Sequence, residues 1–205
     1  RCDQPEAVMK KSLASILLLF PLATTSYAAL DVGDAAPNFT VQAALGGKVY
    51  SFKLSDSLAK GPVVLYFFPA AFSVGCSIEA HEFAESMAKF EALGATVIGV
   101  SSDDIDTLGK FSVQACQGRF PVASDSTQAV MKSYDAVMQT RPDYANRVSY
   151  VIAPNGKVLY TANEDAGTAS ATDLVSGKVI ATLVVGIEPE GVGVSPDGRW
   201  VATST

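Results

Sequence analysis

The apolar residues of this chain fall into short runs whose spacing changes along the sequence. Pro62 to Phe68 (PVVLYFF) is a continuous apolar run, which is typical of a central strand covered on both faces. Residues 38–42 and 48–54 alternate apolar and polar positions around Gly46 and Gly47, and this pattern predicts a β-hairpin. Three later runs predict further strands, at residues 96–100, 120–123 and 148–153.

Helical spacing separates these strands. The stretch 76–93 predicts a helix that begins at or near Cys76, and its inward positions are Phe83, Met87 and Phe90. A second helix is predicted over residues 105–115. A third is predicted after the cap candidates Asp125 and Ser126, carrying Val130, Tyr134 and Val137. Strands that alternate with helices predict an α/β domain with a mixed sheet.

The beginning of the chain has the pattern of a secretory signal. Lys10 and Lys11 precede an apolar stretch from Leu13 to Leu22, and residues 26–28 (SYA) resemble a cleavage site. We therefore expect residues 1–28 to comprise upstream residues and a signal peptide, with export to the periplasm or the extracellular space. A retained anchor is the alternative, but the apolar stretch is shorter than the roughly 20 residues that a span needs.

The pattern of apolar and polar residues changes again beyond Tyr160, where helical spacing stops and short β-like runs alternate with turns. The predicted turns lie at residues 163–167, 176–177 and 196–198. APNGKVLYTAN at residues 153–163 and SPDGRWVATST at 195–205 align without gaps, a spacing of 42 residues (195 minus 153). Repeats of this length are typical of β-propeller blades with four strands each.

Charge and cysteine content narrow the function classes. The net charge of −6 gives no electrostatic footprint for nucleic acid, and we expect no membrane association after signal cleavage. One histidine and unclustered cysteines do not support a structural zinc site. Removal of Cys2 with the signal leaves Cys76 and Cys116, which suggests one redox pair.

Cys76 stands where a loop from the buried run enters a helix. Amide groups and the helix dipole at that point favour negative charge, so the position favours a thiolate nucleophile. An inert, packed cysteine is the alternative.

The segment PxxxSxxC from Pro69 to Cys76 resembles the active-site signature of peroxiredoxins. Four more segments match that family in order: GDAAPNFTVQ, VIGVSSD, FPVASDS and RVSYVIAPNGKV. The resemblance implies a thioredoxin-like fold over residues 29–160, with a mixed central sheet flanked by helices. It implies a thiol-dependent peroxidase that acts on hydrogen peroxide and small organic hydroperoxides without metal or organic cofactor.

The resemblance also assigns roles to individual residues. Cys76 is implied as the peroxidatic cysteine, and Pro69 as the residue that shapes the pocket. Ser73 is implied to hydrogen-bond the peroxide, and Arg147 to hold the thiolate and polarise the O–O bond. Glu79 is a candidate to orient Arg147 through an ion pair, or else a solvated acid in the first helical turn.

The second cysteine departs from the type that the segment CSIEAHEFAE resembles most, the bacterioferritin-comigratory peroxiredoxins. Their resolving cysteine often lies five residues after the first, where this chain has His81. Cys116 is the remaining candidate, since some other peroxiredoxins place that cysteine on the second helix. A one-cysteine mechanism with an external thiol stays open. Either route implies a thiol reductant such as a thioredoxin-like or glutaredoxin-like protein.

Residues 161–205 resemble the repeats of YVTN-type β-propellers. We expect a partial, blade-like repeat rich in hairpins, with the chain ending midway through a repeat. This segment stands where a peroxiredoxin usually continues into a closing helix. Two other functions remain as alternatives: a thiol-disulfide exchange protein, which the absence of a CxxC pair disfavours, and a non-catalytic interaction protein that uses the tail.

Overall fold

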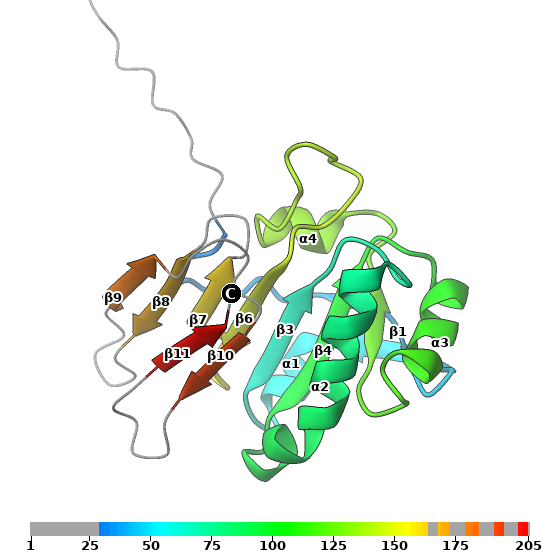
Figure 1. The fold of residues 1–205 in the computed structure, drawn as a ribbon, viewed down its shortest axis with the longest axis horizontal. Coiled ribbons are helices and arrows are strands. Elements are labelled where there is room, and N and C mark those ends of the chain that lie inside the picture. Colours follow the sequence, from blue (N-terminus) through cyan, green and yellow to red (C-terminus); the bar gives the residue numbers. More distant parts are fainter. Residues whose placement is uncertain (1–28, 164–167, 173–178, 185–190, 195–200, 205) are drawn as a thin grey trace, which may run out of the picture.

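The computed structural model describes residues 29–163, 168–172, 179–184, 191–194 and 201–204 (Figure 1). The predicted signal peptide, residues 1–28, lies outside the described residues. So do most of the residues of the three turns predicted beyond Tyr160.

Most described strands form one mixed sheet of nine strands, in the order β2-β1-β5-β4-β3-β6-β7-β8-β9. The pairs β3–β4 and β4–β5 are parallel, and the other pairs are antiparallel. The strands are β1 (Thr40–Leu45), β2 (Lys48–Lys53), β3 (Val63–Phe67), β4 (Thr96–Ser101), β5 (Val122–Ser124), β6 (Val148–Ile152), β7 (Val158–Asn163), β8 (Thr168–Thr172) and β9 (Val179–Val184). The predicted mixed α/β architecture is confirmed.

The central strand β3 is buried on both faces, as its continuous apolar run predicts. Val63, Leu65 and Phe67 belong to one apolar cluster, and the alternate residues Val64 and Tyr66 belong to the other. The short helices α1 (Leu54–Leu58) and α4 (Ala129–Ser133) pack into the first cluster. The longer helices α2 (Val74–Ala92) and α3 (Ile105–Gln114) pack into the second cluster and cover the opposite face (Figure 1).

Helix α2 presents smaller side chains to the sheet than its apolar spacing predicts. Its buried residues are Cys76, Ala80, Ala84 and Met87, whereas Phe83 and Phe90 are only partly buried. Alanine lets the helix lie close to β3 and β4, so the aromatic rings pack at its flank. Phe83 stacks on Tyr66 with 4.5 Å between ring centroids.

The third predicted helix is shorter than expected. Helix α4 ends at Ser133, because Asp135 adopts a positive φ of 50°. Tyr134 and Val137 therefore lie beyond the helix, and the prediction that it carries them is wrong. Neither cap candidate occupies the N-cap position, which is Gln128 in a left-handed conformation, but Asp125 Oδ2 accepts a hydrogen bond from the Met131 amide at 2.8 Å.

The sheet runs through the predicted boundary at residue 160 without interruption. Strand β7 crosses it, pairs with β8, and β8 pairs with β9. Strands β8 and β9 thus extend the sheet beyond β7.

The sequence repeat has a counterpart in strand pairing. Strands β10 (Gly191–Val194) and β11 (Val201–Ser204) form a separate hairpin. In the hairpin β6–β7, Ser149, Tyr150 and Val151 pair with Ala162, Thr161 and Tyr160. Displaced by 42 residues, the same three pairs recur as Gly191, Val192 and Gly193 with Ser204, Thr203 and Ala202. The two hairpins therefore share their register over these three pairs. The fourth pair differs, because β6–β7 has a register shift between Val151 and Ile152.

Within the described ranges, none of the helices combines the length and the apolar character that crossing a bilayer demands.

Two glycines on the α2/α3 side of the sheet give opposite predictions for stability. A Cβ at Gly99 would lie 2.7 Å from the ring of Tyr66, which is buried among aromatic rings. Gly99→Ala should lower the free energy of unfolding by about 1–3 kcal/mol through overpacking. A Cβ at Gly109, inside α3, meets no atom within 4 Å. Gly109→Ala should raise the free energy of unfolding by about 0.5–1 kcal/mol, because alanine is the better helix former. Urea unfolding measures both, and shifts of the same sign would contradict the packing described.

Candidate active site

Cys76 lies in the first turn of α2. Strand β3 ends at Phe67, and the loop from Pro69 to Phe72 leads to Ser73, which occupies the N-cap position. The Ser77 amide donates the first helical hydrogen bond, to the Ser73 carbonyl at 2.9 Å. The amides of the turn that holds Cys76 therefore lie at the positive end of a helix of 19 residues.

Arg147 brings a fixed positive charge to the same sulfur. Its Nη2 donates to Cys76 Sγ at 3.3 Å, and its Nη1 donates to Glu79 Oε2 at 2.8 Å. Glu79 lies one turn after Cys76, so the ion pair holds the guanidinium over the start of the helix. Helix dipole and guanidinium together form the kind of electropositive setting that stabilises a thiolate.

The sheet explains how two residues so distant in sequence meet. Arg147 directly precedes β6, and Val148 of β6 pairs with Phe67, the last residue of β3. The antiparallel register thus places Arg147 beside the loop that leads to Cys76. Gly75 leaves space for it, since a Cβ there would lie 2.6 Å from Arg147 Nη2.

Ser73 and Pro69 belong to the same loop but do not contact the sulfur through hydrogen bonds. The Ser73 hydroxyl is exposed and donates to the Ala70 carbonyl at 3.1 Å. Pro69 is half-buried at the start of the loop. The structure therefore brings Cys76, Glu79 and Arg147 into direct contact, and it places Ser73 and Pro69 on the adjoining loop.

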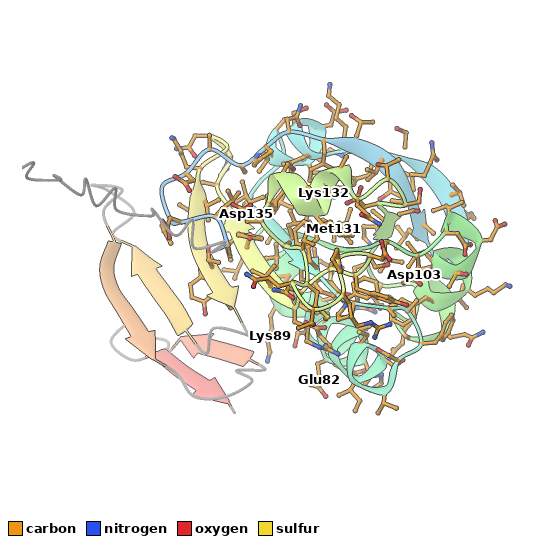
Figure 2. All side chains as sticks on the ribbon, turned by 90° about the horizontal axis from the view of Figure 1, so that it is seen from above. Glu82, Lys89, Asp103, Met131, Lys132 and Asp135 are labelled. Atoms are coloured by element: carbon orange, nitrogen blue, oxygen red, sulfur yellow. The ribbon has the colours of Figure 1, made fainter. Side chains whose placement is uncertain are left out.

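Asp103, which the sequence motifs did not single out, holds this loop from the end of β4. Figure 2 labels Asp103 among the side chains. Its Oδ2 accepts hydrogen bonds from the Ala71 amide at 2.7 Å and from the Ser101 hydroxyl at 2.8 Å. Phe72, the residue after Ala71, adopts a positive φ of 63° and packs edge-on against Phe111. An acid two residues after a buried strand was the available signal, because loops gather at the carboxyl ends of parallel strands.

Cys116 has a very different environment. It follows the end of α3, its side chain is fully buried, and its amide donates to the Phe111 carbonyl at 3.2 Å. Burial raises the pKa of the Cys116 thiol to about 12. Cys76 is likewise buried, with an exposed fraction of 1%. Both cysteines belong to the apolar cluster that includes Tyr66. Both thiols are free.

His81 and the acidic side chains form no metal site within the described residues. His81 is exposed on α2, where its Nδ1 lies 2.9 Å from Gln117 Nε2. No group of three or more His, Cys, Asp or Glu side chains suited to a metal ion is found among the residues that the structure describes.

Comparison with protein families gives two matches. Residues 32–161 match the model described as the AhpC/TSA family, and residues 124–205 match the Cytochrome D1 heme domain. The first match covers most of the chain and contains every residue of the site. The second begins before β6 and extends over both hairpins of the repeat.

Similar sequences include plant proteins. Peroxiredoxin Q, chloroplastic, of Oryza sativa subsp. japonica is 37% identical over 132 residues, which are 64% of this chain and 58% of that protein. The chloroplastic 2-Cys peroxiredoxin BAS1 of Hordeum vulgare is 27% identical over 150 residues, 69% of this chain and 70% of that protein. The chain thus spans under two thirds of the length of the rice relative.

Similar solved structures confirm the predicted thioredoxin-like peroxiredoxin fold. Peroxidoxin BcpB from Mycobacterium tuberculosis has a TM-score of 0.57 and 28% identity, covering 64% of this chain and 84% of that one. A mutant of Xylella fastidiosa PrxQ has a TM-score of 0.59 and 26% identity, covering 66% and 87%.

The raised pKa of Cys116 predicts a loss of stability in alkali. The folded protein keeps the thiol protonated up to about pH 12, whereas the unfolded chain releases that proton above about pH 9. Stability therefore falls as pH rises through this window, by about 2 kcal/mol at about pH 10.5 for this group. Urea unfolding of the wild type and of Cys116→Ala should show that the variant loses less of its free energy of unfolding in alkali, because it lacks this thiol. The buried tyrosines titrate in both proteins and do not contribute to the difference. Equal alkaline losses would contradict the buried environment of Cys116.

Proposed function

The chain belongs to the AhpC/TSA family, the peroxiredoxins, and from this membership we propose that it is a thiol peroxidase that reduces hydrogen peroxide and small organic hydroperoxides. The observation that supports this most directly is the contact between Arg147 Nη2 and Cys76 Sγ at 3.3 Å, in the first turn of a long helix. A thiolate nucleophile with a cation beside it is what an attack on a peroxide requires.

The proposed first step transfers one oxygen atom to Cys76. The thiolate attacks the nearer peroxide oxygen, so that an S–O bond forms while the O–O bond breaks. The electron pair of the broken bond goes to the departing oxygen, which takes up a proton and leaves as water or an alcohol. Arg147 and the helix-start amides stabilise the charge that develops on this oxygen.

Two loop residues complete the proposal. Ser73 supplies a hydroxyl to the bound peroxide, which requires its Oγ to turn away from the Ala70 carbonyl. Pro69 shapes the pocket and limits the access of water to the sulfur. Glu79 acts as a positioning residue, since it binds the Arg147 guanidinium rather than the sulfur.

We propose Cys116 as the resolving thiol. Its sulfur attacks the sulfur of the Cys76 sulfenic acid, a disulfide forms, and the sulfenic hydroxyl leaves as water. A disulfide requires Cα atoms within about 7 Å, so we propose that the first turn of α2 and the segment at Cys116 open to bring the two buried thiols together. A thioredoxin-like or glutaredoxin-like dithiol then reduces the disulfide. Direct reduction of the sulfenic acid by an external thiol is the one-cysteine alternative.

The two competing functions have less support. A thiol-disulfide exchange protein does not need the guanidinium that contacts Cys76. A non-catalytic interaction protein would have no reason to maintain the arrangement of Cys76, Arg147 and Glu79, or the glycine that leaves room for it.

We propose that residues 161–205 belong to a partial β-propeller repeat that begins inside the peroxiredoxin sheet. The antiparallel order β6-β7-β8-β9 corresponds to one four-stranded blade, and β10–β11 repeats three residue pairs of β6–β7. We further propose that the segment before Ala29 is a cleaved export signal, on the charge and apolar pattern of residues 9–28.

The activity is tested by peroxide consumption with dithiothreitol, measured on the chain from Ala29 onward. Cys76→Ser should abolish consumption, and Arg147→Met should lower the rate about 100-fold or more, as for the loss of one charge-stabilising donor. Cys116→Ser should retain activity with this small reductant. After stoichiometric peroxide, intact mass should show loss of two hydrogens in the wild type and gain of one oxygen in Cys116→Ser. An active Cys76→Ser protein would refute the proposal.

Gly75 gives a prediction of its own. The Cβ of Gly75→Ala must displace the Arg147 guanidinium, because the two would lie 2.6 Å apart. We expect the second-order rate of Cys76 oxidation by peroxide to fall about tenfold or more, since the charge moves off the reacting atoms. Gly109→Ala is the matched control and should react at the wild-type rate. A wild-type rate in Gly75→Ala would mean that Arg147 is not needed at this position.

A further inference from the structure

We infer that Gln117 is a positioning residue for the resolving thiol: its side-chain amide ties the turn that carries Cys116 to α2 and delays the release of Cys116. The inference rests on the proposed function and concerns its second step, disulfide formation. It assigns a role to His81 and Glu85, which the catalytic proposal does not use.

The tie consists of two hydrogen bonds from one amide nitrogen. Gln117 Nε2 donates to His81 Nδ1 at 2.9 Å and to Glu85 Oε1 at 3.2 Å. An amide nitrogen only donates, so His81 Nδ1 must be the acceptor in this contact. His81 and Glu85 are four residues apart on α2, which places them on one face of the helix.

The turn that the tie fastens is closed onto the end of α3. Gln117 and Gly118 both adopt left-handed backbone conformations, with φ of 52° and 65°. The Gly118 amide donates to the Ser112 carbonyl at 2.8 Å. This reversal of the chain turns the Cys116 side chain into the apolar cluster and leaves the Gln117 side chain exposed beside α2. Opening of the turn therefore requires that the tie breaks.

The place where the tie attaches separates the two steps of the reaction. His81 and Glu85 lie in later turns of α2 than Cys76. The first turn can unwind around an oxidised Cys76 while the tie stays intact. Release of Cys116 requires that the turn carrying it opens as well, and the tie controls only the opening of that turn. Loss of the tie should leave sulfenic acid formation unchanged and accelerate the attack of Cys116.

The experiment follows both steps in the chain from Ala29 onward, which lacks Cys2, after one equivalent of hydrogen peroxide, with acid quenching and intact-mass analysis. In Gln117→Ala, Cys76 should gain oxygen at the wild-type rate, and the conversion to disulfide should be about three- to tenfold faster. This factor corresponds to the net contribution of about one hydrogen bond to the closed turn. Overoxidation of Cys76 by excess peroxide should decrease by a similar factor, because the sulfenic acid lives for a shorter time.

Two further variants make the test specific. His81→Ala keeps the longer bond to Glu85 and should give a smaller acceleration. The double variant should not exceed Gln117→Ala alone, because both substitutions remove the same contact. Gln114→Ala is the matched control: this exposed glutamine lies three residues away, and no side-chain hydrogen bond is found for it among the described residues. It should resolve at the wild-type rate.

The outcomes separate this inference from the proposed function. A chain whose Cys76 is not oxidised by peroxide refutes the peroxidase proposal itself. Oxidation of Cys76 with unchanged or slower disulfide formation in Gln117→Ala overturns the role of the tie. A sulfenic acid that persists in the wild type and in Gln117→Ala also overturns it, because Cys116 then does not resolve the intermediate.

Discussion

The site depends on one contact, the hydrogen bond from Arg147 to Cys76 Sγ, and the backbone produces that contact more than the side chains do. The pairing of β6 with β3 places the residue before Val148 next to the residue after Phe67. An arginine at the first position and a loop into α2 at the second then meet without any adjustment of the fold. Gly75 removes the Cβ that would separate them, and Glu79 fixes the second guanidinium nitrogen.

Strand β6 therefore has two neighbours with different consequences. On one side, β3 connects it to the loop before Cys76. On the other side, β7 connects it to β8 and β9, so that the C-terminal strands continue the sheet that carries Arg147. An unpaired β7 edge would expose backbone donors and acceptors, and strand addition satisfies them. The hairpin β6–β7 carries this continuation into β8, with one register shift between Val151 and Ile152.

The sequence predicted the features that depend on local pattern. The continuous run from Pro62 to Phe68 predicted the central strand, and a cysteine after PxxxS predicted the loop-to-helix entry. Helix α1 was not predicted, because five residues hold too little periodicity. Contacts such as Asp103 with Ala71, or Gln117 with His81, link residues more than 30 positions apart. Only the sheet order and the helix placement bring such pairs together, so the sequence pattern could mark Asp103 as a candidate but could not show the partner of either residue.

One apolar cluster thus contains two thiols whose surroundings differ in charge rather than in burial. Cys76 and Cys116 are both almost inaccessible to solvent, so exposure cannot explain a difference in reactivity. Cys76 has the helix start and Arg147 beside it, whereas desolvation dominates at Cys116 and keeps its proton in place. The proposed nucleophile and the proposed resolving thiol can therefore share one hydrophobic layer. In the proposed mechanism, the second thiol reacts only after its turn opens, so the order of the two steps follows from the fold.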